Sequence, residues 1–282
     1  MKYESISFRT PETPEASEQE FTIDSIDLKP EKEKTPIPVL FAPGWGFTPE
    51  TLNQSFEVLV ENGRRVISLA HIRESSQVKS DKHVSPELQK AYALLALLDK
   101  KHIEKVDAVA HSEGSINLAI AALEHPEKFR NIVFINPAGM IGENTFPKHI
   151  FKFYTEVFQD FKASLRGKGV FKSVLIEYKE IAKYFLSNPA LSLREAVAIS
   201  QADILQMISE LKQHNIGVSV ISGVDDKIIP MDKLQEKVSS NSINGFYSVK
   251  GGHNEILFQP IKYMGAVDTA LDALEKRGVV DK

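Results

Sequence analysis

Hydrophobic residues follow two different periods along this chain. Near the start, YESISFR at 3–9 and FTIDSIDL at 21–28 alternate apolar and polar positions, which is typical of a hairpin with one buried face. Further on, short runs that are apolar at nearly every position indicate strands buried on both faces. We expect these strands at 37–42, 64–70, 106–110, 130–139, 217–223 and 243–251.

Segments with helical spacing of apolar residues separate these strands. The helix predicted from Ser85 carries an N-cap serine followed by Pro86, the residue pair that favours a helix start. Strands that alternate with helices predict an α/β fold with a mostly parallel central sheet flanked by helices. The other predicted helices span 51–63, 114–124, 231–240 and 260 to about 278.

The alternation stops between 140 and 205, where helix-like segments follow one another without a strand pattern. We therefore expect one core, formed by 1–139 and 206–282, with a helical cap inserted at 140–205. Within the cap, Phe151, Tyr154 and Phe158 recur at helical spacing. They are candidates to line a substrate pocket, although aromatic residues at this spacing more often pack a helix onto its core.

Composition narrows the classes of function. The 282 residues carry a net charge of −4, which gives no electrostatic footprint for nucleic acid. The absence of cysteine excludes disulfides, thiolate zinc sites and a cysteine nucleophile. No apolar run is long enough for an integral membrane segment, and the first residues lack the apolar core of a signal peptide. We expect a cytoplasmic protein.

Unusual residues follow the strand at 106–110. The sequence Ala110-His111-Ser112-Glu113-Gly114 passes at once into a helix-like pattern. Ser112 is either an ordinary helix cap or a nucleophile on a sharp strand-to-helix bend, where small residues let neighbouring backbone approach. The Glu113 side chain either overhangs the pocket or points away along the helix N-terminus, where the helix dipole favours a carboxylate, and we favour the second.

Two later strands end in acidic and histidine residues. Asp225 and Asp226 follow the strand at 217–223, and His253 follows two glycines after the last strand. Each alone is typical of a turn or a solvated loop. In chain order, however, Ser112, an aspartate and His253 each follow a predicted strand, and ligands bind beyond the carboxyl ends of parallel strands.

The loop after the strand at 37–42 reads Pro43-Gly44-Trp45-Gly46. Acyl transfer needs donors aimed at the developing oxyanion. The backbone N–H groups of Trp45 and Glu113 are candidates for this role, with Gly44 allowing the loop to bend. The alternative is a plain glycine-rich turn.

Together these motifs resemble the α/β-hydrolase fold family, and in particular its serine esterases and lipases with a helical cap. The resemblance implies a catalytic triad of Ser112, Asp226 and His253, and it favours Asp226 over Asp225 by its spacing from the strand-end glycine. It also excludes His111 from the triad. Pro43 departs from the pattern, because the family usually has histidine there. His71 and Arg73 depart too, in a loop where many relatives carry Asp-x-x-Gly.

The implied activity is hydrolysis of a small-molecule carboxylic ester, with a small to medium apolar acyl group, through an acyl-enzyme that needs neither metal nor organic cofactor. Carbon–carbon bond hydrolysis, a lyase reaction and a non-catalytic receptor of this fold remain alternatives. Basic residues outnumber acidic ones between 148 and 183. Either these lysines are solvated, or they attract an anionic lipid or substrate. The sequence does not indicate the oligomeric state.

Overall fold

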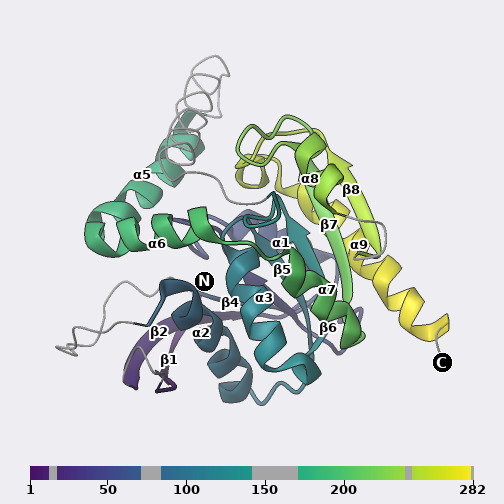
Figure 1. Ribbon diagram of the computed structural model, residues 1–282, viewed down its shortest axis with the longest axis horizontal. Coiled ribbons are helices and arrows are strands. Elements are labelled where there is room, and N and C mark those ends of the chain that lie inside the picture. Colours follow the sequence, from purple (N-terminus) through teal and green to yellow (C-terminus); the bar gives the residue numbers. More distant parts are fainter. Residues whose placement is uncertain (13–17, 71–83, 142–170, 239–242, 281–282) are drawn as a thin grey trace.

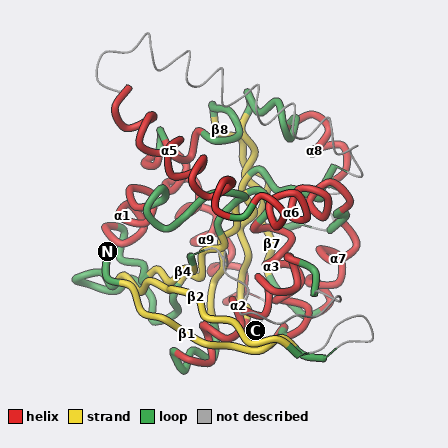
Figure 2. The backbone as a smooth tube through the Cα atoms, turned by 90° about the vertical axis from the view of Figure 1, so that its left-hand side faces the viewer, coloured by secondary structure: helices red, strands yellow, loops and turns green. Residues whose placement is uncertain are grey.

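The computed structural model describes residues 1–12, 18–70, 84–141, 171–238 and 243–280 (Figure 1). One sheet runs through the molecule with helices on both faces, as the view from the side shows (Figure 2). Its eight strands are β1 (Tyr3–Thr10), β2 (Gln19–Leu28), β3 (Val39–Ala42), β4 (Val66–Leu69), β5 (Val106–His111), β6 (Phe129–Ile135), β7 (Gly217–Gly223) and β8 (Gly245–Val249).

The strand order β1-β2-β4-β3-β5-β6-β7-β8 explains where a ligand can bind. β2 pairs antiparallel with β1 and β4, and all other neighbours are parallel. From β3 the chain builds outward through β4 on one side and then through β5 on the other. The order therefore reverses between β3 and β5, and such a switch point opens a crevice at the carboxyl ends of the strands.

The helices form two layers. Helices α1 (Asn53–Glu61) and α9 (Pro260–Val280) cover one face of the sheet, and α2 (Pro86–Lys100), α3 (Gly114–Glu124) and α7 (Leu205–Gln213) cover the other. The short helix α8 (Met231–Lys237) contacts β7. Helices α5 (Phe171–Ser187) and α6 (Pro189–Gln201) are consecutive and contact each other, and α6 also contacts α2 (Figure 1).

Apolar packing on both faces accounts for the continuous apolar runs of the central strands. Leu40 lies in the core beneath α2 and α3, whereas its neighbours Val39 and Phe41 lie in the core beneath α1 and α9. A strand residue points to the opposite face of the sheet from its neighbour. A strand that helices cover on both faces therefore has apolar residues at nearly every position.

The mostly parallel sheet flanked by helices confirms the predicted fold class. Helix α6 begins at Pro189, where the Asn188 side chain caps it by accepting a hydrogen bond from the Leu191 amide at 3.1 Å. The helix α7 was not predicted as a separate element. Residues 142–170 of the proposed cap at 140–205 lie outside the described residues, and so do its candidate pocket residues Phe151, Tyr154 and Phe158 and the loop residues His71 and Arg73.

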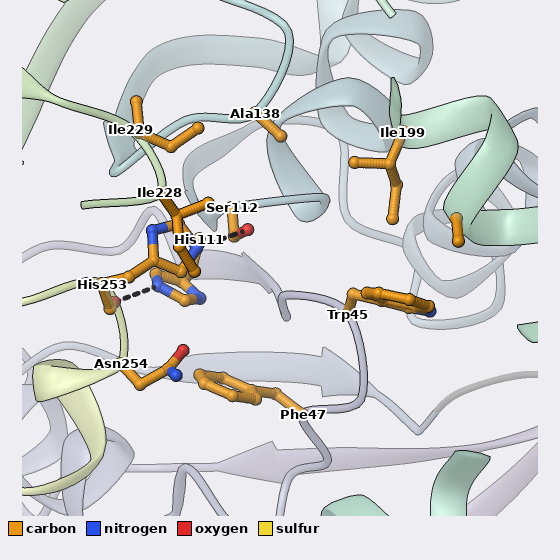
Figure 3. Close-up of a pocket in the computed structure, with 11 residues that line it drawn as sticks. Trp45, Phe47, His111, Ser112, Ala138, Ile199, Ile228, Ile229, His253 and Asn254 are labelled. Carbon is orange, nitrogen blue, oxygen red and sulfur yellow. Dashed lines mark hydrogen bonds between the residues drawn. The ribbon is translucent and has the colours of Figure 1, made fainter. Parts of the chain in front are cut away.

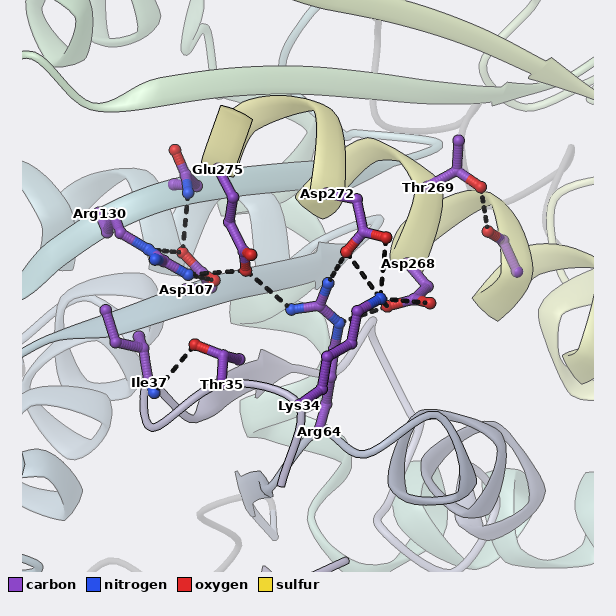
Figure 4. A network of polar contacts seen from close by, with 12 residues as sticks. Lys34, Thr35, Ile37, Arg64, Asp107, Arg130, Asp268, Thr269, Asp272 and Glu275 are labelled. Atoms are coloured by element: carbon purple, nitrogen blue, oxygen red, sulfur yellow. Dashed lines mark hydrogen bonds and ion pairs between the residues drawn. The ribbon is translucent and has the colours of Figure 1, made fainter. Parts of the chain in front are cut away.

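A charged network fastens α9 to the amino ends of the parallel strands (Figure 4). Arg64, just before β4, is fully buried and donates to Asp268 at 2.5 Å, Asp272 at 2.6 Å and Glu275 at 3.1 Å. These three acids occupy one face of α9 at helical spacing. Two further cations join them, with Lys34 contacting Asp268 and Asp272, and Arg130 joining Glu275 to Asp107 of β5.

None of the helices within the described ranges combines the length and the apolar character that crossing a bilayer requires.

Candidate active site

Ser112 lies at the bend between β5 and α3 in a strained backbone conformation. Its φ is 49°, a left-handed value that costs a residue with a side chain on the order of 1–3 kcal/mol. The turn is held by its neighbours: the Ser112 amide donates to Ile135 O at 3.0 Å, and its carbonyl accepts from the Ala138 amide at 3.1 Å. Such strain holds the Ser112 side chain out at the strand end, as a nucleophile elbow requires.

Two glycines allow this bend to pack against the loop after β3. A Cβ on Gly114 would lie 2.3 Å from Ala42 O, and a Cβ on Gly44 would lie 2.6 Å from His111 Nδ1. Neither position can accept a side chain without moving backbone or a buried ring. The elbow and the loop that begins at Pro43 are therefore in direct backbone contact, which explains the small residues that the sequence places at both sites.

His253 connects Ser112 to a buried carboxylate. Its Nε2 lies 2.8 Å from Ser112 Oγ, and its Nδ1 lies 2.8 Å from Asp226 Oδ2. Because a carboxylate only accepts, the proton of the neutral ring sits on Nδ1, and Nε2 is left to accept from the serine hydroxyl. Asp225, the other candidate, is exposed. The structure thus brings together the three residues that the sequence selected from three separate strand ends.

Backbone amides orient the Asp226 carboxylate. Its Oδ1 accepts from the amides of Ile228 and Ile229, both at 2.8 Å, while Oδ2 faces His253. Both carboxylate oxygens therefore have fixed partners, and the side chain is fully buried. This is the arrangement in which a carboxylate holds an imidazole in one tautomer and stabilises its cation.

Two side chains hold the backbone of His253. Its carbonyl accepts from His111 Nε2 at 3.0 Å and from Asn136 Nδ2 at 3.1 Å, and Asn136 Oδ1 in turn accepts from the Gly223 amide at 2.7 Å. Burial, and then the proximity of His253, lowers the pKa of His111 to about 3. His111 is therefore neutral at ordinary pH. Its place beside Ser112 in the sequence gives no sign of its contact with His253, 142 residues away.

An apolar cleft of about 570 Å³ opens above Ser112 (Figure 3). Trp45 and Phe47 approach it from the β3 loop, and α6 contributes Ala196 and Ile199. Its walls consist of Trp45, Phe47, His111, Ser112, Ala138, Ala196, Ile199, Ile228, Ile229, His253 and Asn254.

The side chains of the two candidate oxyanion residues lead to one buried cluster. Trp45 packs edge-on against Phe185 and donates from Nε1 to Glu195 Oε2 at 3.0 Å. Glu113 points away from the cleft, as favoured, but it is fully buried rather than at a solvated helix end, and it pairs with Lys90. Neither Lys90 nor Glu195 was predicted, because each looks like an ordinary surface charge in its own helix.

The acidic and histidine side chains of the described residues form no group of three that could hold a metal ion. Ser112, His253 and Asp226 form a continuous hydrogen-bonded series.

Comparison with known structures shows the same fold in several hydrolases. A thermophilic esterase from Thermogutta terrifontis is 15% identical, with a TM-score of 0.70, covering 96% of this chain and 99% of that one. The enol-lactonase from Burkholderia xenovorans is 14% identical, with a TM-score of 0.66 and coverage of 89% and 97%. A deformylase from Pseudomonas putida is 15% identical, with a TM-score of 0.67 and coverage of 95% and 100%.

At these identities the likeness concerns the fold alone. No curated protein sequence matches the chain. A family model for the alpha/beta hydrolase fold does match, over residues 76–191, a range that includes Ser112 and its elbow. With the sheet order, the strained serine and the fold shared over nearly the whole length, this match shows that the chain has the α/β-hydrolase fold.

Proposed function

We propose that this protein is a serine hydrolase that cleaves a carboxylic ester with a small to medium apolar acyl group. One observation carries the proposal: Ser112 lines an apolar cleft, and hydrogen bonds connect it through His253 to Asp226. The esterase and the enol-lactonase among the fold neighbours support ester chemistry as the first activity to test.

The reaction begins when Ser112 Oγ attacks the ester carbonyl carbon and passes its proton to His253 Nε2. Asp226, held by two backbone amides, stabilises the imidazolium that forms. The carbonyl oxygen becomes an oxyanion, which the backbone N–H groups of Trp45 and Glu113 bind. The C–O bond to the alcohol then breaks, and His253 returns the proton to the departing oxygen.

A water molecule completes the cycle. His253 removes its proton as it attacks the acyl-enzyme carbonyl, and a second oxyanion forms in the same place. Collapse of this intermediate releases the carboxylic acid and returns the proton from His253 to Ser112 Oγ. Because its backbone carbonyl is held by His111 and Asn136, His253 can serve both half-reactions by movement of its ring alone.

The cleft favours an uncharged acyl group. None of its described lining residues carries a formal charge at neutral pH while His111 and His253 are neutral, and isoleucines from two directions form much of the wall. Each buried methylene contributes about 0.8 kcal/mol, or roughly fourfold in an equilibrium constant. We expect kcat/KM on nitrophenyl esters to rise by about this factor per methylene from acetate and to fall once the chain exceeds the cleft.

The test compares Ser112→Ala with Ser115→Ala, a matched change one turn along the elbow in a side chain that takes no part in the proposed chemistry. We expect Ser112→Ala to lose ester turnover and fluorophosphonate labelling, and Ser115→Ala to keep both. Turnover that survives in Ser112→Ala would rule out this nucleophile.

Other outcomes of the same test identify the alternatives. Labelling of Ser112 without turnover of any ester would point to an activated serine with another substrate, such as a carbon–carbon bond. Absence of both would favour a non-catalytic binding protein.

The choice of acid has its own test. Asp226→Asn removes the charge beside His253, whereas Asp225→Asn changes an exposed side chain. We expect a loss of several orders of magnitude in kcat for Asp226→Asn only, and the reverse result would reassign the acid.

A further inference from the structure

A buried cluster of charges lies next to Trp45 and Glu113, the two candidate residues of the oxyanion hole. Lys90 of α2 contacts two carboxylates: Glu113, in the elbow, and Glu195 of α6, whose Oε1 is 2.9 Å from Lys90 Nζ. Glu195 also accepts from Tyr184 of α5 at 2.7 Å and from the Trp45 indole at 3.0 Å. We call these five residues the Lys90 cluster.

The cluster joins both candidate donors of the oxyanion hole. Glu113 provides one backbone N–H and is fixed by its side chain to Lys90. Trp45 provides the other and is fixed by its indole to Glu195. Since Lys90 binds both carboxylates, one ammonium group links the side chains of the two donor residues.

Burial makes this arrangement specific. Glu113 and Glu195 are fully buried, and the Lys90 side chain is about 10% exposed. Buried charges are costly unless paired, so the three groups stabilise one another in only one geometry. Burial alone would lower the pKa of Lys90, but Glu113 and Glu195 hold that pKa well above its usual value, and the ammonium stays charged.

We propose that Lys90 and Glu195 are positioning residues that hold the two backbone donors of the oxyanion hole in place. The proposal rests on the proposed hydrolase function and adds residues that the catalytic series Ser112–His253–Asp226 does not include. Glu195 lies on α6, which also lines the cleft. The position of this helix and the position of the Trp45 donor therefore depend on each other.

The first test compares two changes at one position that remove the same charge. Glu195→Gln keeps an oxygen that can accept from the Trp45 indole, whereas Glu195→Leu has no acceptor. We expect Glu195→Leu to lower kcat by about 10- to 100-fold with little change in KM, because misplaced donors weaken the transition state rather than substrate binding. Glu195→Gln should recover most of this loss.

An inhibitor separates positioning from general damage. A trifluoromethyl ketone forms a tetrahedral oxyanion with the serine, so Glu195→Leu and Lys90→Met should weaken it by the same factor by which they lower kcat. Arg64→Met is the control, because it removes a buried cation at the opposite edge of the sheet. If the folded Glu195→Leu variant bound the trifluoromethyl ketone as tightly as the wild type does, the proposal would be overturned. An equal loss of kcat in Arg64→Met would also overturn it.

Trp45 offers a readout that needs no catalysis. It is the only tryptophan of the chain, so fluorescence that is excited at wavelengths absorbed by tryptophan and not by the seven tyrosines reports on this indole alone. We expect Glu195→Leu to lower its anisotropy and Glu195→Gln to preserve it, also in a Ser112→Ala background. If esters are not turned over at all, the proposed function fails, and unchanged anisotropy in Glu195→Leu would still refute the anchoring role on its own.

Discussion

Replacement of Arg64 by methionine tests whether the charged network at the amino edge of the sheet holds α9 in place. Arg64 has no exposed side-chain surface, and it donates to three acids on α9. Methionine retains much of the aliphatic length but removes the guanidinium. Among the described residues, Lys34 and Arg130 would then remain as cationic partners of Asp268, Asp272 and Glu275.

The expected loss follows from these contacts. Hydrogen bonds to charged groups contribute about 1.5–3 kcal/mol each, and removal of one partner of a buried pair costs about 3–5 kcal/mol. The three acids have side chains 18% to 37% exposed, so water and the two remaining cations compensate part of the loss. We therefore expect the free energy of unfolding to fall by about 3 kcal/mol, with Tm lower by roughly 6–10 °C.

Urea unfolding measures this loss, and Arg65→Met is the matched control. Arg65 is 22% exposed and binds one carboxylate, that of Asp27, so its replacement should cost about 1 kcal/mol. The network lies at the opposite edge from Ser112, and kcat per folded molecule should not change. A loss below about 1 kcal/mol in Arg64→Met, or one no larger than in Arg65→Met, would refute the account of α9.

Three further predictions concern the site and its surroundings. Burial, with the nearby Glu113 carboxylate, raises the pKa of Glu87 to about 8. The folded protein therefore binds this proton more tightly than the unfolded chain, and the free energy of unfolding of the wild type falls as pH rises from about 4.5 to 8. Glu87→Gln should have a free energy of unfolding more than about 1 kcal/mol above that of the wild type at pH 9 but not at pH 4. At Ser112, the left-handed φ should make Ser112→Gly more stable than Ser112→Ala by about 1 kcal/mol in thermal unfolding, the reverse of the usual order. His111→Phe keeps a ring to stack on Phe47 but removes a donor to the His253 carbonyl, so kcat should fall by about tenfold. Its pH–rate profile above pH 4 should keep its shape, because His111 does not titrate there; a displaced profile would contradict the assigned role.

The parts of the fold and site that depend on local pattern could be predicted from sequence. Buried strands are short apolar runs, and Ser112, Asp226 and His253 each follow such a run at a position set by glycines. Chain order then places all three at one edge of a parallel sheet. The choice of Asp226 over Asp225 came from the resemblance to the α/β-hydrolase fold family, and in the structure Asp226 is the one that contacts His253.

Contacts between distant charges could not be predicted. Lys90 lies in a helix where a lysine is usually solvated, and its partner Glu195 is 105 residues away on another helix. Arg64 and Arg65 look equivalent in sequence, yet the first is fully buried and the second is not. In each case the packing of whole helices and strands brings the ion-pair partner close, and the local pattern of the sequence does not show this packing.

The network around Arg64 has a consequence for the order in which the chain is made. Synthesis proceeds from the amino terminus, and the acids that Arg64 needs lie 204 to 211 residues later. Until α9 emerges, Arg64 has none of its three acidic partners, and one face of the sheet lacks its longest cover. The nascent chain can thus pair earlier strands and present Ser112 before α9 is there to stabilise them, and α9 is the helix that closes this face of the domain.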